Sequence, residues 1–194
     1  MRLLIFSLLF STLCSGQSIS SIENQVNDFK DSLWQNKVDT FLLFLEPCVG
    51  GVRPDTCNYF DAHYLFWIQS GMTYVRRFDG CKTYQQALLD TFNPLQYYFR
   101  YKKQIDIEAI KTPTYIQSRK GNAQTKISQT IDHTCFYEMT FYVKAKKTFK
   151  SVSYYDLNFE KFENGKTNIY YKYNQNTKLK QLIDQLTELT NELR

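Results

Sequence analysis

The N-terminus constrains this chain most, because it sets the redox environment in which the rest of it folds. Arg2 supplies a positive charge, an apolar run extends from Leu3 to Leu13, and small residues stand at Cys14 and Gly16. This arrangement is typical of a secretory signal peptide that is removed after Gly16. The run is too short for a membrane-spanning helix, which needs about 20 apolar residues. We therefore expect residues 1–16 to be a signal peptide and the protein to be secreted.

The rest of the chain, residues 17–194, has a length typical of a single domain. Its 178 residues (194 minus 16) are enough to bury a proper core. Its net charge is +4, which is the +5 of the whole chain minus Arg2, and this mild charge does not indicate nucleic-acid binding. No other segment approaches membrane-spanning length. The lysine cluster is more typical of a solvated strand face or a guarded sheet edge than of a binding patch; it comprises Lys144, Lys146, Lys147 and Lys150.

Four cysteines remain in the mature chain: Cys48, Cys57, Cys81 and Cys135. An even number in an oxidising compartment predicts a disulfide framework, and four cysteines allow three pairings. We favour Cys48–Cys57, which closes a short loop with glycine and proline, and Cys81–Cys135, which ties a turn to a strand. The cysteine spacings match no zinc-ligand pattern, so we expect no metal and no cofactor.

The part of the chain before Leu95 is predicted to be mainly helical. The sequence Ser20-Ser21-Ile22-Glu23 has the form of a capping box, and the apolar stripe after it predicts a helix over 20–45. A second helix is predicted over 56–70, with Gly71 as its stop. A short alternating strand, 72–78, separates it from a third helix over 83–92 that ends before Pro94.

The chain after Leu95 is predicted to be a run of strands that ends in one helix. Asn164-Gly165 between two alternating runs is the strongest hairpin signal in it. The expected strands are 97–109, 115–119, 125–131, 135–146, 152–162 and 167–173. Leucines at steps of three and four predict an amphipathic C-terminal helix over 177–194, which either docks on the sheet of its own chain or joins two chains into a homodimer.

This order of elements resembles the nuclear transport factor 2-like superfamily, in which a curved sheet wraps around helices to form a cone. The segment from Phe66 to Leu89 also looks like secreted nematode members of that superfamily, with Gly80-Cys81 where those proteins have a Gly-Cys turn. The resemblance implies an α+β fold with N-terminal helices packed on a curved, mainly antiparallel sheet. The C-terminal helix is an addition to it. Members of the superfamily include enzymes, transport adaptors and proteins without known activity, so the resemblance says little about function.

The candidates for catalytic chemistry are few. His63 lies near Asp61 on the predicted helix 56–70. His133 directly follows Asp132 at a predicted strand end, where neighbouring side chains point to opposite faces. We expect both to be surface or satisfied core residues. Asp106 and Glu108 would be same-face neighbours on the predicted strand 97–109, and the plain interpretation is a solvent face. No sequence template for a hydrolase, a phosphate-binding loop or a zinc protease is present.

Tyrosines are abundant in the predicted strands and would either line a cavity for a small apolar ligand or form ordinary sheet packing. They are Tyr97, Tyr98, Tyr101, Tyr137, Tyr142, Tyr154, Tyr155, Tyr170, Tyr171 and Tyr173. The leading hypothesis is a secreted, non-enzymatic binding or interaction protein with a small apolar ligand or a protein partner. The alternatives are a lyase or isomerase that uses a cavity acid and a tyrosine, and a lipocalin-like carrier of a hydrophobic ligand.

Overall fold

The protein has an α+β fold, as the sequence predicted. The computed structural model describes residues 21–50, 62–80, 84–118, 124–144 and 146–193. In chain order the elements are α1 (Ile22–Gln35), β1 (Thr40–Leu45), β2 (His63–Gln69), β3 (Met72–Phe78), β4 (Ala87–Leu89), α2 (Pro94–Ile107), β5 (Thr114–Ser118), β6 (Gln124–Ser128), β7 (Phe136–Val143), β8 (Lys146–Ser153), α3 (Tyr154–Asn158), α4 (Tyr171–Gln175) and α5 (Lys178–Glu192).

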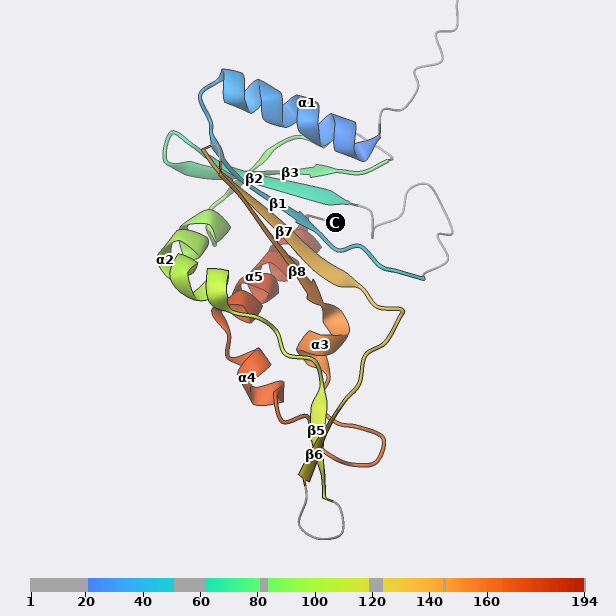
Figure 1. The fold of residues 1–194 in the computed structure, drawn as a ribbon. Helices are drawn as coiled ribbons and strands as arrows, with labels where there is room; N and C mark the ends of the chain where they lie inside the picture. The colour runs from blue at the N-terminus through green and yellow to red at the C-terminus, as the bar shows by residue number, and fades with distance from the viewer. Residues whose placement is uncertain (1–20, 51–61, 81–83, 119–123, 145, 194) are drawn as a thin grey trace, which may run out of the picture.

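Six of these strands form one open antiparallel sheet. Their order is β4-β3-β2-β1-β7-β8, so β1 and β2 lie in the middle and β4 and β8 at the edges. β5 and β6 pair separately as a hairpin that projects from the body of the protein (Figure 1). The lipocalin alternative requires a closed barrel of eight strands, whereas the described strands form this open sheet.

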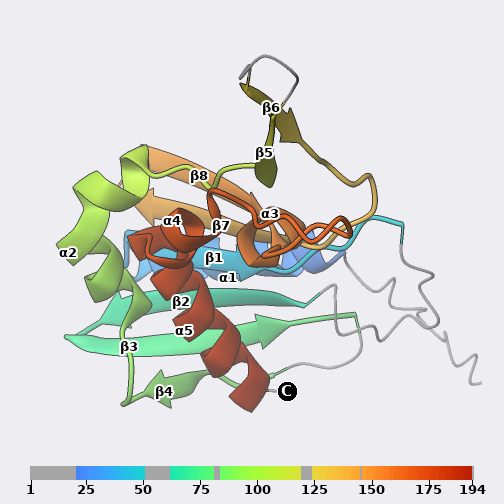
Figure 2. The ribbon, with the colours of Figure 1, turned by 90° about the horizontal axis from the view of Figure 1, so that it is seen from below.

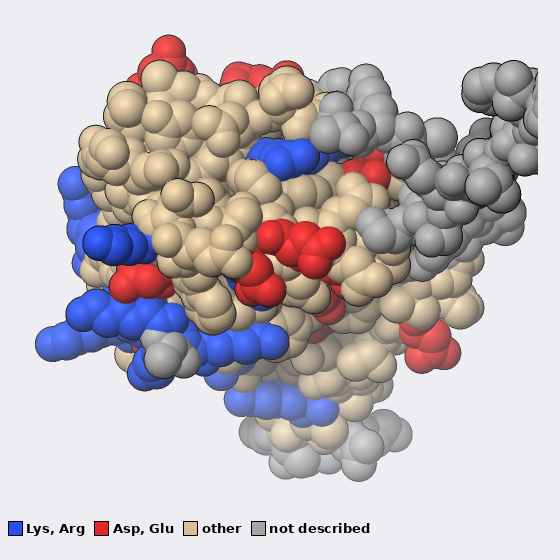
Figure 3. Space-filling view, turned by 90° about the horizontal axis from the view of Figure 1, so that it is seen from above, with Lys and Arg blue, Asp and Glu red and all other residues tan. Residues whose placement is uncertain are grey.

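Helices cover the two faces of the sheet unequally. α1 lies alone on one face, here called the outer face, and α2 and α5 lie on the opposite inner face (Figures 1 and 2). The inner core joins strand residues such as Phe66 and Phe141 to both helices, and the outer core joins Val26 and Leu33 of α1 to Trp67. Seen from the α1 side, lysine and arginine side chains gather along one edge of the molecule (Figure 3).

The C-terminal helix is confirmed, and its apolar stripe packs inside its own chain. The buried members of the stripe are Leu179, Leu182, Ile183, Leu186 and Leu189. Thr177 caps the helix, and the Glu108 carboxylate accepts hydrogen bonds from the main-chain N–H groups of Lys178 (3.1 Å) and Leu179 (2.8 Å). A carboxylate at a helix N-terminus satisfies unpaired donors and complements the helix dipole. The stripe is therefore part of the core. Of the two alternatives for this helix, docking on its own chain is the one that the structure shows.

The predicted helix over 20–45 is only half right. It begins one residue later than the capping box predicted, with Ser21 and not Ser20 as the cap: the Ser21 hydroxyl accepts from the N–H of Asn24 at 3.3 Å. Lys37 then adopts a positive φ of 63°, which stops the helix, and the residues after it form β1. The predicted helix over 56–70 is wrong where it can be seen, because 63–69 is β2. Both strands are central and covered on both faces, so they carry the continuous apolar runs that a buried helix would also show.

Two further predictions around Pro94 are wrong for a related reason. The segment 83–92 contains β4, which pairs with β3 through Thr73 and Leu89, so a strand stands where the third helix was predicted. The predicted strand 97–109 is instead most of α2. Asn93 accepts from the N–H of Gln96 at 2.9 Å and Pro94 occupies the first turn. Asn-Pro opens this helix, because proline in the first turn needs no hydrogen-bond partner for its nitrogen.

The strand and turn predictions later in the chain are partly confirmed. β3, the β5–β6 hairpin and β7 lie where they were expected. The predicted strand 152–162 is wrong beyond Ser153, whose hydroxyl accepts from the N–H of Asp156 (3.3 Å) and caps α3. The Asn164-Gly165 turn forms, with Gly165 at φ 77°, but the predicted strand 167–173 gives only one bridge, Lys161 to Thr167, before α4.

Candidate binding site

A disulfide joins Cys48 to Cys135 at one end of the sheet, where β1 and β7 leave it. The antiparallel register of these strands pairs Leu45 with Glu138, and continuing it by three residues places the two cysteines opposite each other. The favoured pairing of Cys48 with Cys57 and of Cys81 with Cys135 is therefore wrong. It failed because loop lengths, and not the register of two strands far apart in the sequence, were used to choose it. Cys57 and Cys81 lie outside the described residues.

A groove of about 490 Å³ lies beside this disulfide. Segment 131–135 forms one wall and α3 with the residue after it forms the other. Aromatic and aliphatic side chains supply most of the lining, and three polar side chains interrupt it. The lining residues are Ile131, His133, Thr134, Cys135, Tyr154, Tyr155, Asn158 and Phe159. Tyr154 is 52% exposed at its rim, which places a large apolar surface in contact with solvent.

Main-chain hydrogen bonds fix the two walls to each other. The N–H of Tyr154 donates to the carbonyl of Cys135 at 2.8 Å, and the N–H of Tyr155 donates to the hydroxyl of Thr134 at 3.4 Å. The Tyr155 and Phe159 rings lie 4.7 Å apart on α3 and its C-terminal continuation. The groove is thus attached to the disulfide and to the start of β7.

A buried asparagine anchors α3 from behind. The Asn174 amide donates to the carbonyls of Lys111 (2.8 Å) and Asp156 (3.0 Å), and its side-chain oxygen accepts from the N–H of Lys111 at 2.9 Å. Asn168 makes a similar set of bonds to Thr114, Phe159 and Tyr170. Buried amides with satisfied donors and acceptors hold irregular segments in one arrangement. These two side chains therefore hold α3 in place through hydrogen bonds to its main chain, a role that strand pairing fills elsewhere in the protein.

A second, smaller hollow of about 140 Å³ shares the disulfide and Tyr154 with the groove and extends toward Glu46 and Tyr137. Burial, and then the nearby Glu46 carboxylate, raise the pKa of Tyr137 to about 12. Burial likewise raises the pKa of Tyr64 to about 12, against the opposing effect of Arg77. The Tyr64 hydroxyl is buried and has no hydrogen-bond partner. Both phenols therefore stay protonated at neutral pH and can only donate protons in hydrogen bonds or accept at a lone pair.

The structure separates the two histidines. His133 lines the groove and is exposed, and its ring fills the space beside Gly50, where a Cβ atom would lie 2.3 Å from Nδ1. His63 is the first residue of β2, and it has interactions with neighbouring groups. His133 therefore contributes a polar group to the groove. Its ring also leaves no room for a side chain at position 50, which accounts for the glycine there.

Asp106 and Glu108 do not form a carboxylate pair on one strand. Glu108 caps α5, as described above. Asp106 lies near the end of α2, where it forms an ion pair with Lys102 and accepts from the Tyr98 hydroxyl at 3.1 Å. Burial alone would raise the pKa of Asp106, but the hydrogen bonds from Lys102 and Tyr98 outweigh it and the pKa is lowered.

The tyrosines divide among several parts of the fold, and only Tyr137, Tyr154 and Tyr155 meet at the disulfide end. Tyr97, Tyr98 and Tyr101 lie on α2. The sequence did not point to Ile131, Thr134 or Phe159 as lining residues. It placed Ile131 and Phe159 in the predicted strands 125–131 and 152–162, whereas in the structure all three lie between regular elements.

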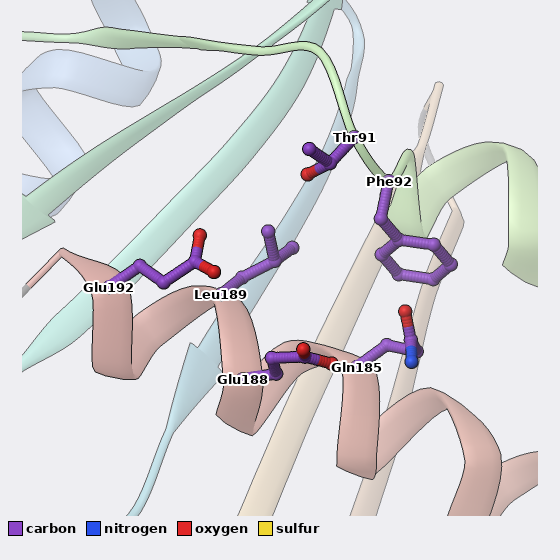
Figure 4. A pocket seen from close by; sticks show the side chains of 6 residues that line it. All are labelled: Thr91, Phe92, Gln185, Glu188, Leu189 and Glu192. Carbon is purple, nitrogen blue, oxygen red and sulfur yellow. The ribbon is translucent and has the colours of Figure 1, made fainter.

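A third hollow, of about 160 Å³, lies between the segment before α2 and the C-terminal half of α5 (Figure 4). Its walls are Thr91, Phe92, Gln185, Leu189 and the glutamates Glu188 and Glu192. Figure 4 shows the Phe92 ring facing Gln185, which partly closes one side. Within the described ranges, no group of three or more His, Cys, Asp or Glu side chains is arranged to hold a metal ion. No helix in the described part of the chain is long and apolar enough to cross a membrane.

The structure is that of an α+β protein with an open antiparallel sheet and a groove beside a disulfide. No protein-family model, no curated protein and no solved structure matches the chain. The resemblance to the nuclear transport factor 2-like superfamily therefore stays a prediction. Two of the segments that carried it as helices, 56–70 and 83–92, contain β2 and β4 in the structure.

Proposed function

We propose that this is a secreted, non-enzymatic binding protein whose groove beside Cys48–Cys135 holds a small apolar ligand. The observation that carries the proposal is the aromatic lining of this groove, above all the exposed ring of Tyr154. Secretion rests on the predicted signal peptide. The disulfide is the kind of bond that persists in oxidising compartments, and it adds modest support.

The size and the lining of the groove support this choice. Small-molecule sites commonly enclose about 300–1,000 Å³, with mostly apolar walls and a few polar groups that orient the ligand. The groove has a volume of about 490 Å³, and Thr134, His133 and Asn158 interrupt its apolar lining. A ligand with a flat apolar ring and one or two hydrogen-bonding groups fits this chemistry best.

The enzyme alternative depends on Glu46 and the two phenols with raised pKa. Protonated tyrosines near a carboxylate resemble the acid and hydrogen-bond donors of a lyase or isomerase site. The hollow beside Glu46, however, has a volume of only about 140 Å³, below the usual range for a substrate site. Binding is therefore the better-supported function. A ligand that the protein converts, with turnover lost in Glu46→Gln and binding retained, would reverse this order.

Tyr154→Ala tests the proposal, with Tyr173→Ala as the matched control. Tyr173 is also a largely exposed tyrosine (44%), but it lies on α4 and outside the groove lining. The probe is 1-anilinonaphthalene-8-sulfonate, whose fluorescence rises when it enters an apolar site. We expect saturable binding to the wild-type protein and to Tyr173→Ala, and a loss of about tenfold or more in affinity for Tyr154→Ala, as for a central aromatic anchor.

Three results would count against the groove. The first is the absence of saturable binding to the wild-type protein. The second is equal binding by the wild-type protein and Tyr154→Ala, and the third is an equal loss in Tyr154→Ala and Tyr173→Ala. Thermal unfolding of both variants shows that each is folded during the titration. Light scattering of the same samples tests the alternative of a homodimer, because a monomer mass at high concentration would exclude it.

A further inference from the structure

The outer face carries a second surface that the groove does not explain. Lysines and aromatic residues meet at the end of the sheet where α1 ends and where β7 turns into β8. We call this surface the basic–aromatic patch, and it consists of Lys30, Trp34, Lys37, Tyr142, Lys144 and Lys147. In the view from the α1 side, the basic side chains gather along this edge (Figure 3).

Contacts between distant segments bring the patch together. The Lys30 and Lys147 ammonium groups lie 4.5 Å and 5.9 Å from the centre of the Tyr142 ring. The N–H of Lys144 donates to the carbonyl of Asp39 at 2.8 Å, which places the β7–β8 turn beside the segment that carries Lys37. Residues from α1, from the segment before β1 and from the β7–β8 hairpin therefore share one surface.

The positive charge of the patch is only partly compensated. The ion pairs recorded among the described residues join other cations to aspartates: Arg77 to Asp79, Lys102 to Asp106 and Lys180 to Asp184. The Lys30 ammonium group donates to the neutral side chain of Asn27 at 3.1 Å. Burial, with the nearby charge of Lys147, lowers the pKa of Lys30 and outweighs the opposite effect of Asp31. Two aspartates, Asp31 and Asp39, lie in the same segments as the four lysines of the patch, so its net charge is positive.

The lysine cluster of the sequence divides between two roles. Lys150 points to the inner side and donates to the carbonyls of Asp106 (2.8 Å) and Glu108 (3.3 Å), where it complements the C-terminal end of α2. Lys147 instead lies over Tyr142 on the outer face. Lys150 thus complements the end of a helix and Lys147 contributes to the outer surface, and both lie on the edge strand β8.

Exposed aromatic surface accompanies the charge. Trp34 is 46% exposed, and its ring lies 6.2 Å from the buried Phe41, the cross-strand neighbour of Tyr142. Phe149 is 54% exposed two residues after Lys147. α1 packs on β2 and β3, toward the opposite edge of the sheet from β8. The residues of β8 that alternate onto the outer face, Lys147, Phe149 and Ser151, are exposed.

We propose that the basic–aromatic patch binds an acidic extracellular polysaccharide. Lys30 and Lys147 share the Tyr142 ring, and Lys37 and Lys144 extend the positive surface beyond it, which suits a polymer with repeated sulfate or carboxylate groups better than a single small anion. The exposed indole of Trp34 offers a flat apolar face to a sugar ring. The predicted secretion places such polymers within reach, whereas nucleic acid is not expected outside the cell. α1 buries its apolar side chains Val26 and Leu33 against the sheet, so the patch presents separate exposed rings and not the continuous apolar face of a membrane-surface helix.

The double variant Lys30→Gln, Lys147→Gln tests the proposal, with Lys161→Gln, Lys172→Gln as the control of equal charge change. Lys161 and Lys172 are exposed and lie outside the patch. The probe is a heparin oligosaccharide, titrated by isothermal calorimetry at several NaCl concentrations. We expect the patch variant to bind at least about tenfold more weakly, and the slope of log Kd against log salt to fall by about one for each lysine removed, as for other polyanions.

A third variant separates the aromatic contribution from the charge. Trp34→Ala is expected to weaken heparin binding without changing the salt slope, because it removes stacking and no charge. Circular dichroism and thermal unfolding show whether each variant keeps its fold.

Four outcomes would overturn the proposal. The first is that heparin does not bind the wild-type protein at about 0.15 M NaCl. At that concentration long-range attraction is screened, and a real site must bind through close contacts. Equal losses in the patch and control variants would show attraction to net charge alone. An unchanged affinity in the patch variant would place the binding elsewhere. Binding to phosphatidylserine vesicles, and not to heparin, would identify the partner as a membrane surface.

Discussion

The two faces of the sheet are built differently, although they share every strand. The inner face is covered by α2 and by α5, whose leucine stripe is fully occupied by the core of the same chain. Among the described elements, α1 is the helix that covers the outer face. The core there is smaller and a larger share of its residues is aromatic, as with Phe29 and Trp67, whose ring centres lie 5.3 Å apart. At the end of this face the rings of Trp34 and Phe149 remain exposed.

This difference teaches where stability and recognition are located. Two helices and several buried leucines exclude water from the inner face, so we expect it to supply most of the stabilisation from apolar burial. One helix cannot cover six strands, so the outer face keeps accessible lysines and aromatic rings. The groove lies at the end of the sheet, beside the disulfide, where regular strands give way to α3.

The largest expected effect acts on both faces at once. Cys48→Ser, Cys135→Ser removes the bond between β1 and β7, which lie in the middle of the sheet. The two cysteines are 87 residues apart, and the chain-entropy model gives about 4 to 5 kcal/mol for a loop of that length. Urea denaturation measures the loss.

Peptide mapping by mass spectrometry is the control for this connectivity. A cross-linked peptide that contains Cys48 and Cys135 is expected. If the mature chain holds two disulfides, as its cysteine count predicts, Cys57 and Cys81 remain as the other pair. A peptide that joins Cys48 to Cys57 would contradict the connectivity in the structure.

A matched pair of truncations compares the two faces directly. Leu186 of α5 is fully buried in the inner core, and Leu33 of α1 is 6% exposed in the outer core. Leu186→Ala is expected to lower the free energy of unfolding by about 3 to 5 kcal/mol and Leu33→Ala by about 2, because a better-enclosed site leaves a larger cavity. Urea denaturation at the same pH gives both values. A larger loss in Leu33→Ala would reverse the assignment of the main core.

The smallest effect concerns a tyrosine on the inner face. Because the Tyr64 hydroxyl is buried without a partner, Tyr64→Phe should change stability by less than about 1 kcal/mol at pH 7. The folded-state pKa of about 12 exceeds the ordinary value of 10.0, so the folded state holds this proton more tightly. The stability that Tyr64 contributes is complete below pH 10 and is lost as the pH rises toward 12.

The variant should therefore lose less stability than the wild-type protein between pH 10 and pH 12. Thermal unfolding across this range checks the expectation. Tyr74→Phe is the control on the outer face, where the hydroxyl lies near the Met72 sulfur. Parallel curves for the wild-type protein and Tyr64→Phe would show that Tyr64 ionises without resistance from the fold.

Local signals in the sequence were reliable where they act locally. The serine cap of α1, the Asn-Gly turn and the leucine stripe of α5 depend on residues within a few positions of one another, and each forms, although the cap is Ser21 and not the Ser20 of the predicted capping box. The Asn93-Pro94 signal was also present but was interpreted as a helix stop and not as a helix start. For the candidate site, the sequence indicated Cys135, Tyr154 and Tyr155. It gave no indication of Ile131 and Phe159, which tertiary contacts bring to the groove.

The sequence by itself determined the α+β class, the C-terminal helix and the hairpin of β5 and β6, because hydrophobic periodicity and turn chemistry are properties of short segments. Only the tertiary structure decided that 40–45 and 63–69 are strands, because burial on both faces removes the alternation that marks a strand. It also decided the partner of Cys48. That choice depends on the register between β1 and β7, which are brought together by packing across some 90 residues of chain.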